Sequence, residues 1–133
     1  MIACGGGGIP VIQSADGSLT GVGAVIDKDR TSALLAHSLE ARLFLLCTSV
    51  DAIFTGWGTP AQRRLDRIAT AAASSLLQAG EFGSGSMAPK VEAALDYMAE
   101  SQDPSRRAVI GRLEHLPHLL EGTSGTSIGD FEP

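Results

Sequence analysis

The chain has 133 residues, of which 44% are hydrophobic and 19% charged, with a formal net charge of -5 at pH 7. This length predicts one domain, and the apolar content is too high for a disordered chain. The few Lys and Arg residues are scattered, which argues against a nucleic-acid surface, and no apolar run approaches the roughly 18 residues of a membrane span. The residues after Met1 lack the pattern of a signal peptide, so we expect a cytoplasmic protein.

The first part of the chain predicts extended structure followed by a helix. Short apolar stretches at residues 2–4 and 8–12 precede a turn signal at residues 15–17, and residues 19–26 read as a return strand. Residues 27–41 then carry apolar side chains at helical spacing, with acidic residues in the expected first turn.

The middle of the chain predicts a buried strand and a helix. Residues 43–47 are a continuous apolar run, typical of a strand buried on both faces of a parallel sheet, and residues 50–54 predict another short strand. Thr70 is suited to cap a helix that runs through Gln78, and Gly80 is placed to end it.

The last part predicts a helix over residues 87–100 capped by Ser86, a core strand over residues 108–110 and a short helix over residues 113–120. Strands thus alternate with helices along most of the chain. This alternation predicts an α/β sandwich with a mostly parallel sheet, formed by one domain over residues 1–133.

The two cysteines, Cys4 and Cys47, lie inside apolar, strand-like runs. We expect two buried free thiols, with a disulfide as the alternative.

Four consecutive glycines, Gly5, Gly6, Gly7 and Gly8, follow the first apolar run. The backbone N–H groups of such a turn can surround an anion. The run matches neither the P-loop nor the dinucleotide fingerprint, so by itself it favours a plain turn over a phosphate loop.

Three charged residues, Asp27, Lys28 and Asp29, stand where a predicted strand passes into a helix. Ligands of open α/β sheets bind along this carboxyl edge, where Lys28 would neutralise phosphate charge and an aspartate would orient it. A solvated helix start explains the same charges equally well.

A further lysine, Lys90, stands in the first turn of the helix that follows Gly83, Gly85 and Ser86. Basic residues are disfavoured near the positive end of a helix dipole, so an anion between the helix end and the ammonium group would explain the position. A flexible loop with one exposed lysine is the alternative, and we favour the anion site.

A predicted strand that ends in polar residues, among them Thr48 and Asp51, would bring hydroxyls and a carboxylate to the same edge, where Phe54 or Trp57 would pack on an adenine ring. Taken alone, this segment favours hydrophobic core followed by a polar turn. The three histidines show no metal-ligand spacing, so the sequence predicts no protein metal site.

Taken in order, these segments resemble the amino acid kinase family, and most closely its carbamate kinase branch. Gly-Gly-Gly-Gly-Ile-Pro-Val with Asp-Lys-Asp downstream is the pattern specific to carbamate kinases. The resemblance is carried by residues 2–11, 24–29, 48–52, 58–60, 85–94 and 120–126.

The resemblance implies a three-layer α/β/α fold that binds ATP or ADP with Mg²⁺ and transfers a phosphoryl group between ATP and carbamate, giving carbamoyl phosphate, in arginine breakdown. It implies that Asp27, Lys28 and Lys90 serve the phosphates, and that Gly5–Gly8 border the carbamate and the transferred phosphate. Magnesium would be held mainly by the phosphates. The implied nucleotide-binding residues are Lys28, Thr48, Asp51, Ala52, Phe54, Gly58, Met87 and Lys90.

The sequence also departs from the family pattern. Ser49 stands where Asp is usual, Ala88 where Gly is usual, and Ser127 where a basic residue is common. The family's N-terminal half, with a phosphate loop, another lysine and most of the carbamate pocket, has no counterpart here. We therefore expect a C-terminal nucleotide-binding half that forms homo-oligomers and is inactive alone or works as part of a split enzyme. The alternatives are a non-catalytic nucleotide-binding or regulatory module and an inert remnant.

Overall fold

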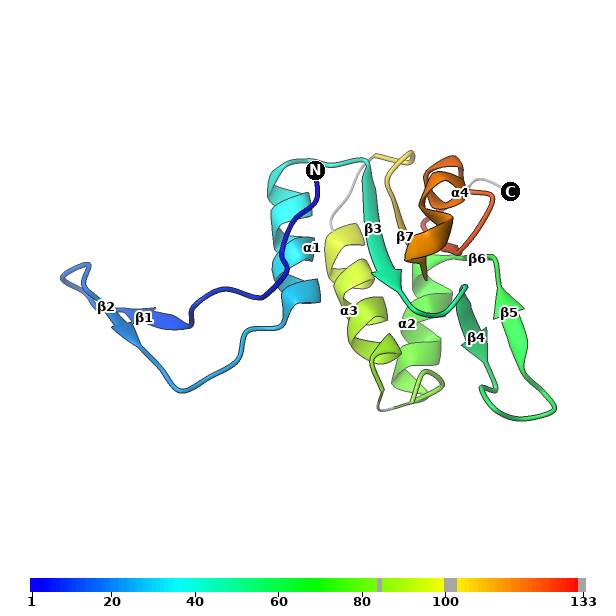
Figure 1. Cartoon of the computed structure of the whole chain (residues 1–133), viewed down its shortest axis with the longest axis horizontal. Coiled ribbons are helices and arrows are strands. Elements are labelled where there is room, and N and C mark those ends of the chain that lie inside the picture. Colours follow the sequence, from blue (N-terminus) through cyan, green and yellow to red (C-terminus); the bar gives the residue numbers. More distant parts are fainter. Residues whose placement is uncertain (84, 100–102, 132–133) are drawn as a thin grey trace.

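A four-stranded mixed sheet organises the computed structural model, which describes residues 1–83, 85–99 and 103–131 (Figure 1). Its strand order is β3 (Leu43–Thr48), β7 (Arg107–Arg112), β8 (Thr126–Ile128) and β6 (Arg67–Ile68). The β3–β7 and β6–β8 pairs are parallel, with Leu45 opposite Val109 in the first, whereas β7 and β8 are antiparallel. The predicted α/β class is confirmed. The sheet is mixed because β8 runs antiparallel to β7.

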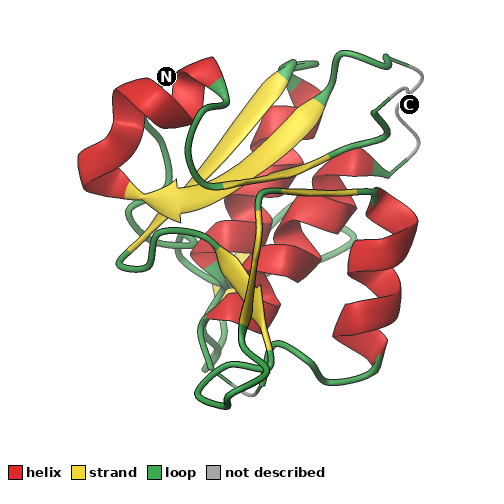
Figure 2. Ribbon diagram, turned by 90° about the vertical axis from the view of Figure 1, so that its right-hand side faces the viewer, coloured by secondary structure: helices red, strands yellow, loops and turns green. Residues whose placement is uncertain are grey.

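The helices are α1 (Lys28–Ser38), α2 (Thr70–Gln78), α3 (Met87–Met98) and α4 (Leu116–Glu121), the last preceded by the 3₁₀ turn Leu113–His115. Figure 2 shows the sheet between α4 on one side and the longer helices on the other, which gives the three expected layers. In the described part of the chain, none of these helices is long and apolar enough to cross a membrane.

The core lies between the sheet and α3. Alternate residues of β3, Phe44 and Leu46, are buried, and the ring centroid of Phe44 is 5.1 Å from that of Tyr97 on α3. The side chain of Tyr97 is fully buried, and its hydroxyl donates a hydrogen bond of 2.5 Å to the carbonyl of Ala41. This packing sets α3 against the strand whose end forms the candidate site.

The expectation that residues 43–47 are buried on both faces was wrong. Leu43 and Leu45 are half-buried and Cys47 is exposed, because they lie on the face of β3 opposite to that of the buried Phe44 and Leu46, and this face is only partly covered. Both cysteines are free, as predicted, but Cys4 is half-buried rather than buried.

The first residues of the chain run beside α1, and the segment that follows them forms an arm that extends away from the body (Figure 1). It contains the antiparallel hairpin of β1 (Val11–Gln13) and β2 (Leu19–Gly21), whose strands are exposed. Residues 2–4 form no strand, and the return strand expected over residues 19–26 ends at Gly21, since no neighbouring strand continues the ladder.

The ends of the helices test the capping predictions. Asp27, expected in the first turn of α1, is its N-cap, and the helix ends at Ser38, earlier than expected. Ala69 rather than Thr70 occupies the N-cap of α2, because the hydroxyl of Thr70 donates to the carboxylate of Asp130 instead. Gly80, in the left-handed region with φ of 73°, follows α2 as predicted.

The second hairpin, β4 (Ile53–Thr55) with β5 (Arg63–Leu65), stands where a strand over residues 50–54 was expected. The predicted cap of α3 is also wrong in its chemistry, since Ser86 is the N-cap residue but its side chain makes no capping hydrogen bond. The expected end of this helix at Glu100 lies outside the described residues.

Candidate functional site

A cavity of about 310 Å³ opens where β3 ends and α3 begins. Three segments form its walls: the end of β3 with the following hairpin, the loop after α2, and the start of α3. The lining residues are Thr48, Ser49, Val50, Ala52, Phe54, Trp57, Phe82, Gly83, Gly85, Ser86 and Met87.

Most of the cavity wall is apolar and aromatic. Phe82 is buried, and the ring centroids of Phe54 and Trp57 lie 5.3 Å apart in a tilted arrangement. The hairpin that carries Phe54 is anchored by the buried Thr126, whose Oγ1 accepts a 2.7 Å hydrogen bond from the N–H of Ile53 and donates one of 2.5 Å to the carbonyl of Leu65. Such a wall suits a flat, partly apolar group.

A cluster of three charges lies at the starts of α1 and α3. The Nζ of Lys90 is 2.9 Å from Oδ2 of Asp29, and the Nζ of Lys28 is 3.7 Å from the same oxygen. The side chain of Lys90 is 9% exposed, that of Asp29 11% and that of Lys28 51%. One carboxylate thus holds two ammonium groups close together, and the half-exposed ammonium group of Lys28 can also reach an anion in solvent.

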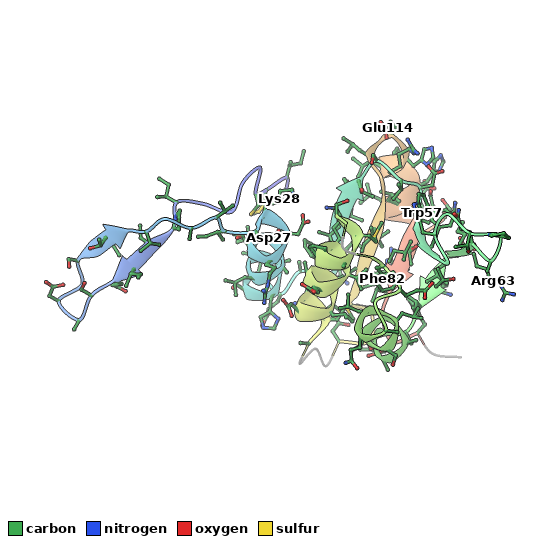
Figure 3. The ribbon with its side chains drawn as sticks, turned by 90° about the horizontal axis from the view of Figure 1, so that it is seen from below. Asp27, Lys28, Trp57, Arg63, Phe82 and Glu114 are labelled. Carbon is green, nitrogen blue, oxygen red and sulfur yellow. The ribbon has the colours of Figure 1, made fainter. Side chains whose placement is uncertain are left out.

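Asp27 fixes the beginning of α1 beside this cluster (Figure 3). Its Oδ1 accepts hydrogen bonds of 2.9 Å from the backbone N–H groups of Asp29 and Arg30. The bond from Arg30 lowers the pKa of the Asp27 carboxyl below its ordinary value, and the bond from Asp29 adds to this effect. Asp27 therefore orients the segment that carries Lys28.

The structure brings the predicted nucleotide residues together in two groups. Thr48, Ala52, Phe54 and Met87 all line the cavity. Lys28 and Lys90 meet instead at Asp29. The two groups adjoin on α3, because Met87 lines the cavity and Lys90 follows one turn later on the same helix.

Besides the two lysines, two further predicted residues lie outside the cavity lining among the described residues. Asp51 turns to Arg112, whose Nε is 2.5 Å from Oδ1, and this hydrogen bond lowers the pKa of the Asp51 carboxyl. Gly58 belongs to the loop next to Trp57 and has φ of 75°. The resemblance assigned both residues to the nucleotide site, and Asp51 was also expected at the sheet edge where the predicted strand ends.

The glycine run is attached to α1 rather than to the cavity. The carbonyl of Gly7 accepts a hydrogen bond of 3.3 Å from the hydroxyl of Thr31. Gly5, Gly6 and Gly8 are exposed. The run therefore lies along the helix that begins with Lys28.

Sequence reasoning missed two features of the site. Phe82 lines the cavity, but the loop after α2 carries no local signal that it meets the end of β3. Asp29 was recognised only as part of a charged run, although its contact with Lys90 joins two helices. Among the described residues, no group of three or more His, Cys, Asp or Glu residues is arranged to hold a metal ion.

Comparisons with known proteins place this geometry in a family. The amino acid kinase family matches residues 4–110. The chain is 45% identical over 128 residues to the carbamate kinase of Halobacterium salinarum and 43% identical over 128 residues to that of Haemophilus influenzae. Each alignment covers 96% of this chain but only 40% and 39% of the relative, so the chain spans about 40% of the length of these curated relatives.

Solved structures agree with the sequence comparison. A carbamate kinase from Giardia lamblia bound to AMP-PNP matches with a TM-score of 0.86 and 32% identity, over 93% of this chain and 42% of that chain. A protein from Aeropyrum pernix matches with a TM-score of 0.83 and 38% identity, over 92% of this chain and 38% of that chain. The resemblance found in the sequence is confirmed, and the chain belongs to the amino acid kinase family.

Proposed function

We propose that the chain binds the nucleotide of a carbamate kinase reaction and holds its phosphates for transfer between ATP and carbamate. The observation that carries this proposal is the junction on α3, where the apolar cavity adjoins the cluster of Lys28, Asp29 and Lys90. The Giardia relative bound to AMP-PNP supports a nucleotide as the ligand. The proposed setting, cytoplasmic arginine breakdown, rests on the sequence resemblance alone.

In this proposal the base and ribose occupy the cavity, and the phosphates follow the start of α3 toward the lysines. A helix N-terminus offers backbone N–H groups and the positive end of its dipole to an anion. The side chain of Ser86 makes no capping hydrogen bond in the described structure, which leaves the first turn of α3 free to receive a phosphate oxygen.

Each charged residue then has a separate task. Lys28 and Lys90 neutralise phosphate charge, Asp29 keeps their ammonium groups together, and Asp27 fixes the start of the helix that carries Lys28. Phosphoryl transfer needs this positioning and positive charge rather than a covalent intermediate. The glycine run, joined to the same helix at Gly7, is proposed to border the transferred phosphate.

Magnesium has no cage of protein ligands among the described residues. We therefore propose that it enters bound to the phosphates of ATP or ADP, whose charge it neutralises. No protein side chain is assigned to the ion.

The first test is calorimetric titration with Mg-ADP of the wild-type chain and of Lys28→Ala. We expect the substitution to lower the affinity by about 1.5–3 kcal/mol, the loss of one charge-assisted contact. The half-exposed side chain of Lys28 makes this change compatible with folding. Arg30→Ala is the matched control, because Arg30 is an exposed cation of the same helix that pairs with Asp96 at 3.5 Å. Equal affinities of wild type and Lys28→Ala would refute the assignment of Lys28.

The second test is a coupled assay for ATP formed from carbamoyl phosphate and ADP. We expect no activity from the 133-residue chain alone, because placing the second reactant supplies about 7–11 kcal/mol of a barrier and the relatives use a much longer chain. Adding a polypeptide that corresponds to the remaining length of a relative should restore turnover. Activity of the chain alone would show that these residues also place the acceptor.

The same measurements separate the alternatives. Binding of Mg-ADP without activity in either assay would favour a non-catalytic nucleotide-binding or regulatory module. Absence of nucleotide binding to a folded chain would indicate an inert remnant.

A further inference from the structure

The sequence of β3 and its surroundings in the structure disagree. Residues 43–47 are a continuous apolar run, which is the pattern of a strand covered on both faces and paired on both sides. One face is covered, since Phe44 and Leu46 are buried on the side of α3. On the other face Leu43 and Leu45 are half-buried and Cys47 is exposed. The composition of β3 therefore fits an environment that the described chain supplies only in part.

The outer edge of β3 opens into an apolar groove of about 320 Å³. Among the described residues β3 pairs with β7 alone, so the backbone groups along its outer edge have no strand partner. The walls of the groove come from both sides of the sheet, with Leu35 of α1 and the following Leu39 on one side and Leu45 of β3 and Leu120 of α4 on the other. A strand laid along this edge would find apolar walls for the side chains of both its faces.

The residues before α1 extend this apolar surface. Met1 and Ala3 line the groove, and most of the exposed large apolar side chains of the described chain lie in residues 1–26. They include Ile9 and Val25, which are at least 85% exposed. Large contiguous apolar patches are rare on soluble monomers and mark sites of interaction. The groove and the segment that leads from it thus have the properties of an interface.

The relatives indicate what occupies this interface. Their alignments cover 96% of this chain, yet more than half of each carbamate kinase lies outside them. In the relatives that additional length belongs to the same polypeptide as the matching part. It can pack against the matching part only on surfaces that this chain leaves uncovered, and the groove at β3 is such a surface along a sheet edge.

We propose that the groove and the outer edge of β3 bind a companion polypeptide, equivalent to the remaining length of the relatives, which adds an apolar β-strand to the sheet beside β3. The inference rests on the proposed function for the need of such a polypeptide and names the surface that receives it. Because β3 ends at Thr48, which lines the cavity, one end of the added strand would lie next to the proposed nucleotide site. A second copy of this chain on the same edge is the alternative that the test must separate.

Cys47 provides a local probe of the docked strand. Its thiol is exposed and lies on the same face of β3 as Leu43 and Leu45. The chain would be co-expressed with the part of the Haemophilus influenzae carbamate kinase that lies outside the alignment, and the complex purified through a tag on that part. We expect equal amounts of both polypeptides and alkylation of Cys47 by iodoacetamide at least about 10-fold slower than in the chain alone, because apolar burial raises the pKa of a thiol and lowers its thiolate fraction. Mass spectrometry of the peptide that contains Cys47 would measure the rate.

Two exposed leucines test the two walls of the groove. Leu39 and Leu120 are 54% and 51% exposed, so Leu39→Lys and Leu120→Lys are compatible with folding. Each variant should weaken the complex at least about 10-fold, because the docked strand would bury an unpaired charge. The matched controls are Leu34→Lys and Leu113→Lys, exposed leucines of α1 and of the turn before α4 that do not line the groove. The controls should bind the companion as the wild type does.

A fused chain guards against a companion that does not fold by itself. The same part of the Haemophilus influenzae enzyme would be joined ahead of Met1, in the order that the sequence resemblance implies, and Cys47 should be protected to the same extent. If neither the co-expressed nor the fused companion slows the alkylation of Cys47, the proposal is overturned. It is also overturned if the chain alone at high concentration protects Cys47 and the companion adds nothing, since a second copy then occupies the groove.

Nucleotide binding is measured separately, so the two proposals can fail independently. A complex that protects Cys47 but binds no Mg-ADP would leave this interface in place and refute the proposed function. Binding of Mg-ADP with Cys47 unprotected in both the complex and the fused chain would do the reverse.

Discussion

The ammonium nitrogen of Lys90 lies 2.9 Å from a carboxylate oxygen of Asp29, and both side chains are nearly buried. Because Asp29 is on α1 and Lys90 on α3, this contact joins the two helices as well as organising the proposed phosphate site. Fold stability and ligand affinity should therefore respond to the same pair.

Replacing Lys90 by methionine should lower the free energy of unfolding by about 3 kcal/mol, the lower end for breaking a buried ion pair. The lower end applies because Lys28 stays 3.7 Å from the same carboxylate. Urea denaturation would measure the loss. The double variant Asp29→Leu, Lys90→Met should recover most of it, since an apolar pair leaves no buried charge. A double variant less stable than the single one would contradict this account.

Asp27 should make the stability of α1 depend on acid. The hydrogen bond from the backbone N–H of Arg30 lowers the pKa of Asp27 in the folded protein. The contribution of Asp27 to the free energy of unfolding is therefore complete above the ordinary aspartate pKa, and it is lost as the pH falls through the lower pKa of the folded state. Asp27→Ala should cost about 1 kcal/mol at neutral pH through loss of the cap.

The control is Asp27→Asn, which still caps the helix but does not titrate. Urea denaturation would be carried out at neutral pH and at a pH below the ordinary pKa of aspartate. At neutral pH this variant should have nearly the wild-type free energy of unfolding. On acidification its free energy of unfolding should fall less than that of the wild type. An Asn variant as unstable at neutral pH as the Ala variant would argue against the capping role.

Gly125 and Gly122 form a matched pair, since both have positive φ, 76° and 75°. Gly122→Ala should cost about 1–2 kcal/mol for the left-handed backbone, because its Cβ would meet only Arg107 at 3.9 Å. Gly125→Ala should cost a further 1–3 kcal/mol or so, because its Cβ would come 2.8 Å from the carbonyl oxygen of Ile110. Thermal denaturation of both variants would measure the difference in stability between them. Equal losses of stability in the two variants would contradict the crowding at Gly125.

The free edge of β3 should cause self-association. Among the described residues β3 pairs with β7 alone, and an apolar groove of about 320 Å³ beside it is lined in part by Leu43 and Leu45. Exposed apolar edges recruit other chains. Light scattering should show a mass that rises with concentration, and Leu45→Lys should reduce this rise.

Leu34→Lys is the control for this prediction, because Leu34 is an exposed leucine on α1 that does not line that groove. It should leave the association unchanged. A constant monomer mass of the wild type over a wide concentration range would refute the prediction.

The sequence by itself determined the features that depend on near neighbours along the chain. The beginning of α1, Gly80 after α2, and the strand at residues 43–47 follow from acidic residues suited to a first helical turn, backbone freedom at glycine and apolar patterning. The order of the glycine run and the Asp-Lys-Asp segment also identified the family.

Only the tertiary structure decided which residues act together. The contact between Lys90 and Asp29 spans 61 positions, and so does the contact that turns Asp51 to Arg112. Cys47 is exposed because it lies on the less covered face of β3, and Phe82 reaches the cavity because the loop after α2 meets the end of β3. Local patterns carry no information on such partners, since the pairing of strands and the packing of helices fix them through contacts between distant segments of the chain.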